Sequence, residues 1–271
     1  MKKRFALILG LSLLFALFLA GALAPEYVST PELDHRFEGF FEAPPFGTDE
    51  RGIPLHEYAM QGAYIVAFPA VAAACFVMGL ATIAGLVRCA DIRWIDALLQ
   101  VGGEILGALP RMVVILVVAV SLPYGWKILL PIALVWAVLA SPSAMDEAAV
   151  SAARLGGSRF VEALQAHGFS ATRIYLYHVV WLNLRPVIVR QGAEVFMQVV
   201  FLEIALSYLA IKTSQPSFTH AENLYSWATL LYQGYTWMLG QPLFHAMVVG
   251  VGLISLVVVL AQSLRIAARA R

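Results

Sequence analysis

Long apolar runs separated by short polar segments make up most of the chain. A helix that crosses a bilayer needs about 20 mostly apolar residues. We expect six such spans, at residues 5–24, 64–87, 112–122 with an upstream extension from 95, 128–140, 187–211 and 243–264. The third stretch contains Glu104, Pro110 and Arg111 and the fourth is short, so a count of five stays open. The pattern predicts an all-α, polytopic membrane protein.

Composition strengthens this prediction and excludes several classes of function. Of the 271 residues, 61% are hydrophobic and 13% are charged, about half the charged share of a soluble domain. The two cysteines are too few for a disulfide scaffold or a Cys-based zinc site. The six histidines are scattered without helical i,i+4 pairs, so we expect no metal site and no cofactor. A net charge of +1 argues against a nucleic-acid partner.

The distribution of charge predicts the orientation in the membrane. Basic residues collect on the cytoplasmic side of spanning helices, and an inside amino terminus places thirteen of the 18 Lys and Arg residues there. Residues 25–57 carry eight acidic and two basic residues, which predicts an acidic loop outside. We therefore expect both termini in the cytoplasm, a first transmembrane helix at 1–24, an acidic periplasmic loop at 25–63 and a core at 64–271.

The amino terminus has a second interpretation, a cleaved signal peptide. Lys2, Lys3 and Arg4 precede an apolar run that ends at Ala22-Leu23-Ala24, a small-residue sequence like a cleavage site. Residues 5–24 contain no charge over 20 positions, whereas the apolar core of a signal peptide has about 7–15 residues. The length favours a retained helix, and cleavage would leave five spans in the same orientation.

The longest inner segment, residues 141–186, has a helical rather than a disordered pattern. Residues 158–167 predict a short amphipathic helix with Phe160, Val161 and Leu164 on one side. Gly168 can take the positive φ that often ends a helix. Ser170 is a plausible N-cap for a second helix. The prediction is a helix, a glycine corner and a second helix.

Ionisable residues inside a span usually face protein or water, and the fifth predicted span has several. Arg190 and Glu194 are four residues apart, so they can pair on one face, which Gln198 extends. Glu203 is nine residues beyond Glu194 and therefore lies on the opposite side of the helix. We expect these groups to line a translocation path or a subunit interface; a neutralised structural pair is the alternative for the first two.

Two charges in the third span have a simpler interpretation. Glu104 and Arg111 are seven residues apart and share a helix face, with Pro110 adding a kink. We expect a structural ion pair between them.

Three segments occur in a fixed order and together frame nearly the whole chain. They are Pro45-Phe46-Gly47-Thr48-Asp49-Glu50-Arg51-Gly52 before the second span, Phe160-Val161-Glu162-Ala163-Leu164 with Gly168 in the inner segment, and Phe201-Leu202-Glu203-Ile204-Ala205-Leu206-Ser207-Tyr208-Leu209 in the fifth span. In this order they resemble the inner-membrane permease subunits of bacterial ABC importers of the dipeptide, oligopeptide and nickel type. Leu164 stands where that family has a second Ala, and Val180-Trp181 where it has Leu-Pro. The literal string Glu147-Ala148-Ala149 lacks the glycine six residues later.

The resemblance implies a role for the inner segment. In that family the segment forms a coupling helix that docks on a separate ATPase, so the 158–178 loop would couple through Glu162, Ala163, Gly168 and Arg173. The implied partners are a second permease subunit, in a heterodimer, ABC ATPase subunits and an extracytoplasmic substrate-binding protein. The implied place is the bacterial inner membrane, with a peptide or similar small solute as cargo.

Missing motifs separate the remaining classes of function. The chain contains no P-loop, so ATP hydrolysis is expected in another subunit and this chain is not expected to be an enzyme. A Gly-x-Ser-x-Gly elbow and a His-Glu-x-x-His motif are also absent, which argues against an intramembrane hydrolase. An ion-coupled secondary transporter that uses the charged fifth span is the alternative. Such proteins usually show internal repeats, and the sequence shows no clear repeat.

Overall fold

The computed structural model describes residues 2–25, 29, 31–43, 45–123, 129–155, 158–208, 226–237 and 244–269. The structure is 83% helical, and its described residues form no β-strand. The elements are α1 (Lys2–Ala22), η1 (Leu33–His35), α2 (Leu55–Cys89), α3 (Arg93–Gly107), α4 (Arg111–Ser121), α5 (Leu129–Arg154), α6 (Ser158–Ala166), η3 (Arg173–Leu184), α7 (Arg185–Tyr208), α8 (Trp227–Trp237) and α9 (Phe244–Ala268). The all-α prediction is confirmed.

Among the described residues, four or five helices are long and apolar enough to cross a membrane. The helices α1, α2, α5 and α9 are long and apolar enough, and α3 with α4 would make one more, as a pair bent by 78°. Pro110 lies at the bend, where its missing N–H interrupts the backbone hydrogen bonds of a continuous helix. The helix α7 is not in this set and carries two arginines and two glutamates. A membrane protein is therefore supported; the predicted count of six is not confirmed by the described residues, and the alternative count of five agrees with them.

The helix α2 is the centre of the bundle, and it packs against α1, α5 and α7. Small side chains at its interface with α5, such as Ala73 on α2 and Ala137 and Ala144 on α5, are completely buried. Small residues let helix backbones approach closely, which favours packing where lipid gives little hydrophobic driving force between helices. The interface between α2 and α5 is the most extensive in the described part of the chain, and both helices bury several alanines.

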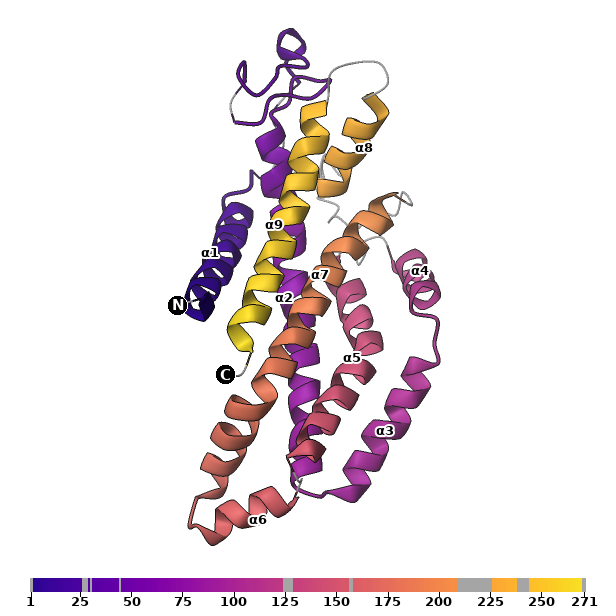
Figure 1. The fold of residues 1–271 in the computed structure, drawn as a ribbon. Helices are drawn as coiled ribbons and strands as arrows, with labels where there is room; N and C mark the ends of the chain where they lie inside the picture. The colour runs from indigo at the N-terminus through magenta and orange to yellow at the C-terminus, as the bar shows by residue number, and fades with distance from the viewer. Residues whose placement is uncertain are drawn as a thin grey trace.

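The two ends of the chain lie side by side, and several helices extend beyond them. The Lys3 ammonium group donates to the Arg269 carbonyl oxygen at 2.5 Å. The 35 residues of α2 correspond to about 52 Å of helix, well over the roughly 30 Å of a hydrocarbon core. Past the level of the chain ends, α2, α3, α5 and α7 continue, and α6 lies across their far end (Figure 1). We call this part, centred on α6 and η3, the α6 end.

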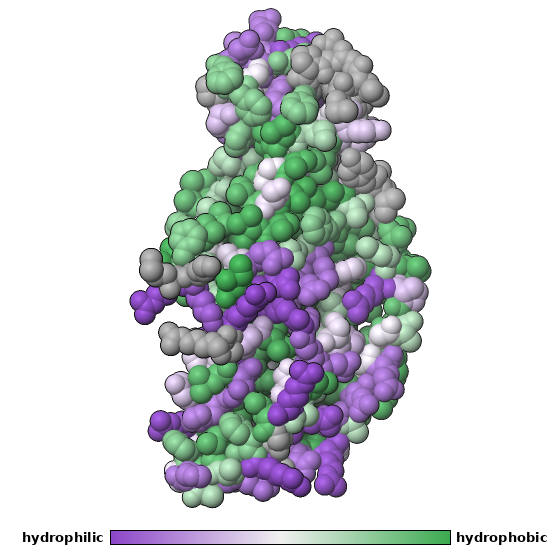
Figure 2. All heavy atoms as spheres, viewed as in Figure 1, coloured by the Kyte–Doolittle hydropathy of each residue, from purple (hydrophilic) through white to green (hydrophobic). Residues whose placement is uncertain are grey.

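Surface hydropathy follows the same division. Figure 2 shows hydrophobic side chains gathered over the middle and upper part of one face, where α2 and α9 run. Hydrophilic side chains gather at the level of the chain ends, continue below it among hydrophobic ones, and cover parts of the loop at the opposite end. A belt of this kind between two polar ends is what a bilayer-embedded protein requires.

The loop before α2 is tightly hydrogen-bonded. Asp49 is completely buried, and its carboxylate accepts from the backbone N–H groups of Arg51 and Ile53, both at 2.8 Å, and from the Tyr58 hydroxyl of α2. Nε2 of His245 on α9 lies 3.1 Å from the carbonyl oxygen of Thr48, the residue before Asp49. These bonds fix the 31–54 loop, as we call it, to the ends of α2 and α9.

Helical structure covers most of residues 141–186, where we predicted an inner loop. The helix α5 continues to Arg154, because its alanine-rich second half has high helix propensity even without long apolar side chains. The π-helical segment η3 joins α7 without a break. The helix α8 was not predicted at all. Glu26 of the predicted outer loop and Ile211, the predicted end of the fifth span, lie outside the described residues.

Candidate functional site

The helix α6 is amphipathic, as predicted, and its two faces have different environments. Val161 is 5% exposed and belongs to the core, and Phe160 and Leu164 pack partly buried against it. Glu162 and Ala163 are exposed on the other side. The apolar face thus fixes α6 to the bundle while the predicted coupling residues face away from it.

Gly168 ends α6 in the left-handed conformation, with φ at +81°. Its N–H donates to the Gln165 carbonyl oxygen at 2.8 Å, and the Phe169 N–H donates to the Leu164 carbonyl oxygen at 3.2 Å. This pair of bonds is a Schellman motif, which caps the last carbonyl groups of a helix. The predicted glycine corner is therefore present, and the next helix begins at Ala171, directly after Ser170.

The corner is supported from the η3 side. The Arg173 guanidinium lies over the Phe169 ring, 4.9 Å from its centroid, a cation–π contact that stiffens the corner. Next to it, the apolar side chains of Leu176 and Tyr177 are 61% and 48% exposed. The α6 end therefore presents a charged helix face beside uncovered apolar side chains.

The polar residues of α7 have different partners from those predicted. Arg190 pairs with Glu147 of α5 rather than with Glu194, so the predicted i,i+4 pair is wrong. The same Glu147 carboxylate accepts from the Gln191 side chain. The packing of α7 on α5 decides which glutamate pairs with Arg190. Glu194 is four residues away on the same helix, but Glu147 lies on the helix that α7 packs against. Glu147 is a residue that sequence reasoning missed as a partner.

The remaining polar residues lie on two faces of α7, as expected. Gln198 accepts from the indole N–H of Trp136 on α5 at 3.0 Å. Glu203 is 1% exposed, and its Oε1 accepts from the Ser207 hydroxyl at 2.9 Å. Ser226, just before α8, also contacts this carboxylate. The face with Gln198 packs on α5, and Glu203 lies toward α8.

Glu104 and Arg111 do not form the predicted ion pair in the described part of the chain. Instead both line a cavity of about 540 Å³ between α2, α3 and α5. Asp146 and Ser143 of α5 line it too, together with the paired Arg88 and Asp96. The bend at Pro110 separates α3 from α4. Glu104 and Arg111 therefore do not share the face of one continuous helix, as the sequence suggested. The outcome is a polar cavity at the α6 end.

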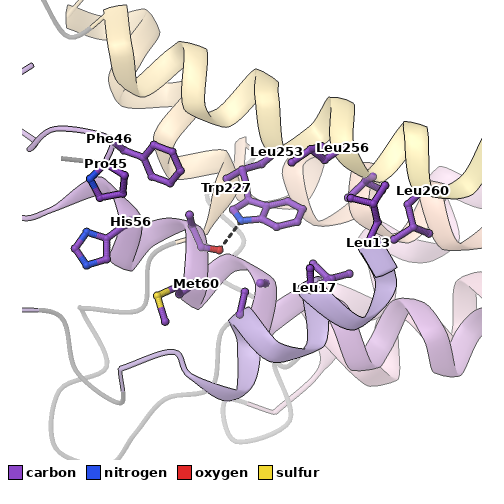
Figure 3. A pocket seen from close by; sticks show the side chains of 15 residues that line it. Leu13, Leu17, Pro45, Phe46, His56, Met60, Trp227, Leu253, Leu256 and Leu260 are labelled. Atoms are coloured by element: carbon purple, nitrogen blue, oxygen red, sulfur yellow. Dashed lines mark hydrogen bonds between the residues drawn. The ribbon is translucent and has the colours of Figure 1, made fainter. Parts of the chain in front are cut away.

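A second cavity, of about 450 Å³, lies between α1, α2 and α9. Its lining is apolar except for His56 at one end and the indole of Trp227 (Figure 3). That indole N–H donates to the Ala59 carbonyl oxygen at 2.9 Å. Across residues 2–25, 29, 31–43 and the later described ranges, no His, Cys, Asp or Glu cluster is arranged to hold a metal ion.

No family model matches the chain, and no curated protein sequence matches it significantly.

Proposed function

We propose that the chain is a transmembrane permease subunit of an ATP-driven ABC importer in a bacterial inner membrane. It passes a small solute, such as a peptide, that an extracytoplasmic binding protein delivers. ATP is hydrolysed by separate ATPase subunits, and a second permease completes the membrane part of the complex. The chain itself carries out no chemical step.

The main support for this proposal is the structure of the α6 end. A short helix fixed by its apolar face, ended by a rigid glycine corner and exposing Glu162 and Ala163, is suited to dock in a groove of a partner. The corner at Gly168 joins α6 to the next helix, and η3 continues into α7 without a break, so a displacement of α6 is passed through the capped corner to α7. Rigid-body movement of spanning helices is how alternating access operates.

The polar cavity adds support from the transport side. The exposed large side chains of α3, namely Trp94, Leu98, Val101 and Ile105, point away from the bundle. Gly103, on the other face of α3, is buried, and a Cβ there would be 3.6 Å from Pro142 of α5. An apolar face outward and a polar face toward a cavity is the reverse of a soluble amphipathic helix. It is the arrangement that a solute path between spans requires.

The test is co-purification from the native host in mild detergent, with identification of all retained proteins. We expect a P-loop ATPase and a second permease with the wild-type chain. The variant Glu162→Ala with Gly168→Pro should lose the ATPase, because proline removes the capping N–H of residue 168 and cannot adopt its positive φ. Asp34→Ala, at an exposed acid of the 31–54 loop, is the matched control and should retain it. A homo-oligomer without any ATPase would contradict the proposal.

Glu203 favours one alternative, an ion-coupled secondary transporter. Its Oε2 has no hydrogen-bond partner in the described part of the chain. A buried carboxylate on a membrane helix often serves as a coupling group. This function predicts uptake driven by an ion gradient without ATP and abolished in Glu203→Gln. The importer predicts uptake that depends on ATP.

A further inference from the structure

The apolar cavity between α1, α2 and α9 is a groove with a definite floor and rim. Trp227 is 2% exposed and lies in the floor, with the N–H edge of its indole toward α2. This placement requires Gly62, since a Cβ there would be 2.2 Å from Cδ1 of the indole. His56, Pro45 and Phe46 lie together at one end in Figure 3, toward the 31–54 loop. The groove therefore has an apolar body and one polar end.

The helix α1 approaches its neighbours closely at two buried glycines. A Cβ on Gly10 would be 2.6 Å from the Ser263 hydroxyl oxygen of α9, and one on Gly21 would be 3.1 Å from the Tyr64 backbone of α2. Leu13, Ala16, Leu17 and Ala20 lie between these glycines and line the groove. The two close contacts hold α1 in place, and between them Leu13, Leu17 and Ala20 are only partly buried against the core, which leaves the groove.

Water is a poor occupant of this space. An apolar cavity stays dry unless polar groups offer a water molecule two to four hydrogen bonds. The lining side chains other than His56 and Trp227 are Leu, Ala, Val, Met, Phe and Pro. The indole N–H already donates to Ala59. The interior of the groove therefore favours an apolar ligand over water.

The surroundings point to one such ligand. The helices α1, α2 and α9 are all long and apolar enough to span a membrane, so the groove opens into lipid rather than water. Its volume of about 450 Å³ is within the range of roughly 300–1,000 Å³ that small-molecule sites occupy. A linear hydrocarbon chain fits a groove that follows the helix axes, and its polar head would meet the rim.

We propose that the groove binds one acyl chain of a phospholipid, with the headgroup beside His56. The lipid fills the space between α1 and the α2–α9 pair and so completes the packing that the two glycines begin. Interiors tolerate few voids, because atoms that line a void lose their dispersion contacts. The bound chain is thus a structural component of the folded protein and independent of the transported solute.

Lipid retained by the purified full-length chain tests this proposal. The chain is extracted from native membranes in mild detergent, washed, and analysed by native mass spectrometry. We expect the wild type to retain a phospholipid in equal molar amount and Ala16→Phe, which fills the groove, to lose it. Gly252→Phe on α9 is the matched control, because its Cβ meets no atom within 4 Å and it does not line the groove. Equal retention by Ala16→Phe, or none by the wild type, would overturn the proposal.

Photolabelling of the wild-type chain covers the case in which Ala16→Phe does not fold. Vesicles containing a phosphatidylethanolamine with a diazirine on one acyl chain are fused with native membranes and illuminated. The expected labels are on Met60 and Val257 inside the groove. Labels confined to outward-facing positions such as Phe15, which is 69% exposed, would overturn the proposal.

Discussion

The 31–54 loop and the α6 end both turn the chain at glycines with positive φ, but the glycines are held in opposite ways. A Cβ on Gly47 would be 2.4 Å from the Glu38 carbonyl oxygen, and one on Gly52 would be 1.9 Å from that of Glu32. A Cβ on Gly168 would meet no atom within 4 Å. The loop is thus tightly packed at these two glycines and acts as a clamp between α2 and α9. The corner after α6 is open, and only its backbone conformation holds it.

The largest effect is expected where the clamp is tightest. Gly52→Ala forces a methyl group into the Glu32 backbone at a residue with φ of +78°. We expect a loss of about 3 kcal/mol or more, because backbone cannot give way as a side chain can. Thermal unfolding in detergent measures it. Gly39→Ala in the same loop, where a Cβ meets nothing within 4 Å, should leave the melting temperature unchanged.

A smaller effect is expected at the open corner. Gly168→Ala meets no clash, so its cost is that of a left-handed alanine, about 1–2 kcal/mol. We expect this cost to be local: α6 becomes more accessible to protease while the melting temperature of the bundle is preserved. A lower melting temperature of the whole bundle in Gly168→Ala would contradict this, because it would show that the corner after α6 matters to global stability as much as the 31–54 loop does.

The link between the α6 end and the bundle is tested by the pair of Glu147 and Arg190. Both side chains are partly exposed, so a double-mutant cycle with Glu147→Gln and Arg190→Gln should give a coupling of about 0.5–1 kcal/mol. Glu194→Gln serves as the comparison and should show no coupling to Arg190→Gln. Coupling of Arg190→Gln to Glu194→Gln but not to Glu147→Gln would show that Arg190 pairs with Glu194 within α7 instead.

The smallest effect concerns the pH dependence of the 31–54 loop. Nδ1 of His35 lies 2.6 Å from Glu38, and this hydrogen bond raises the pKa of the exposed His35 above its ordinary value of 6.5. The stabilisation is therefore complete below pH 6.5 and is lost as the pH rises through the higher folded-state pKa. Proteolysis of the loop should quicken over that window in the wild type. His35→Gln should show a flat profile.

Local features were predicted better than tertiary ones. The helix at residues 158–167, the glycine corner at 168 and the interruption at Pro110 each depend on a few neighbouring residues, and the structure confirms each within one or two positions. Their signals are hydrophobic spacing, a residue able to take positive φ, and a missing N–H.

Partners across helices could not be predicted from spacing. Arg190 has a glutamate four residues away on its own helix and another on α5, and only the packing of α7 on α5 selects Glu147. In the same way, Glu104 and Arg111 share a face on a straight helix but are separated by the 78° bend. The two cavities depend on where three helices meet, which leaves no mark in any single segment.

The most direct test of the account is photocrosslinking from Ala163 in native membranes. A photoreactive amino acid at this exposed position of α6 faces away from the bundle and should capture a P-loop ATPase. The same group at Phe41, which is 99% exposed in the 31–54 loop, should capture no ATPase. Crosslinks from Ala163 to lipid alone, or an ATPase captured from Phe41, would contradict the account.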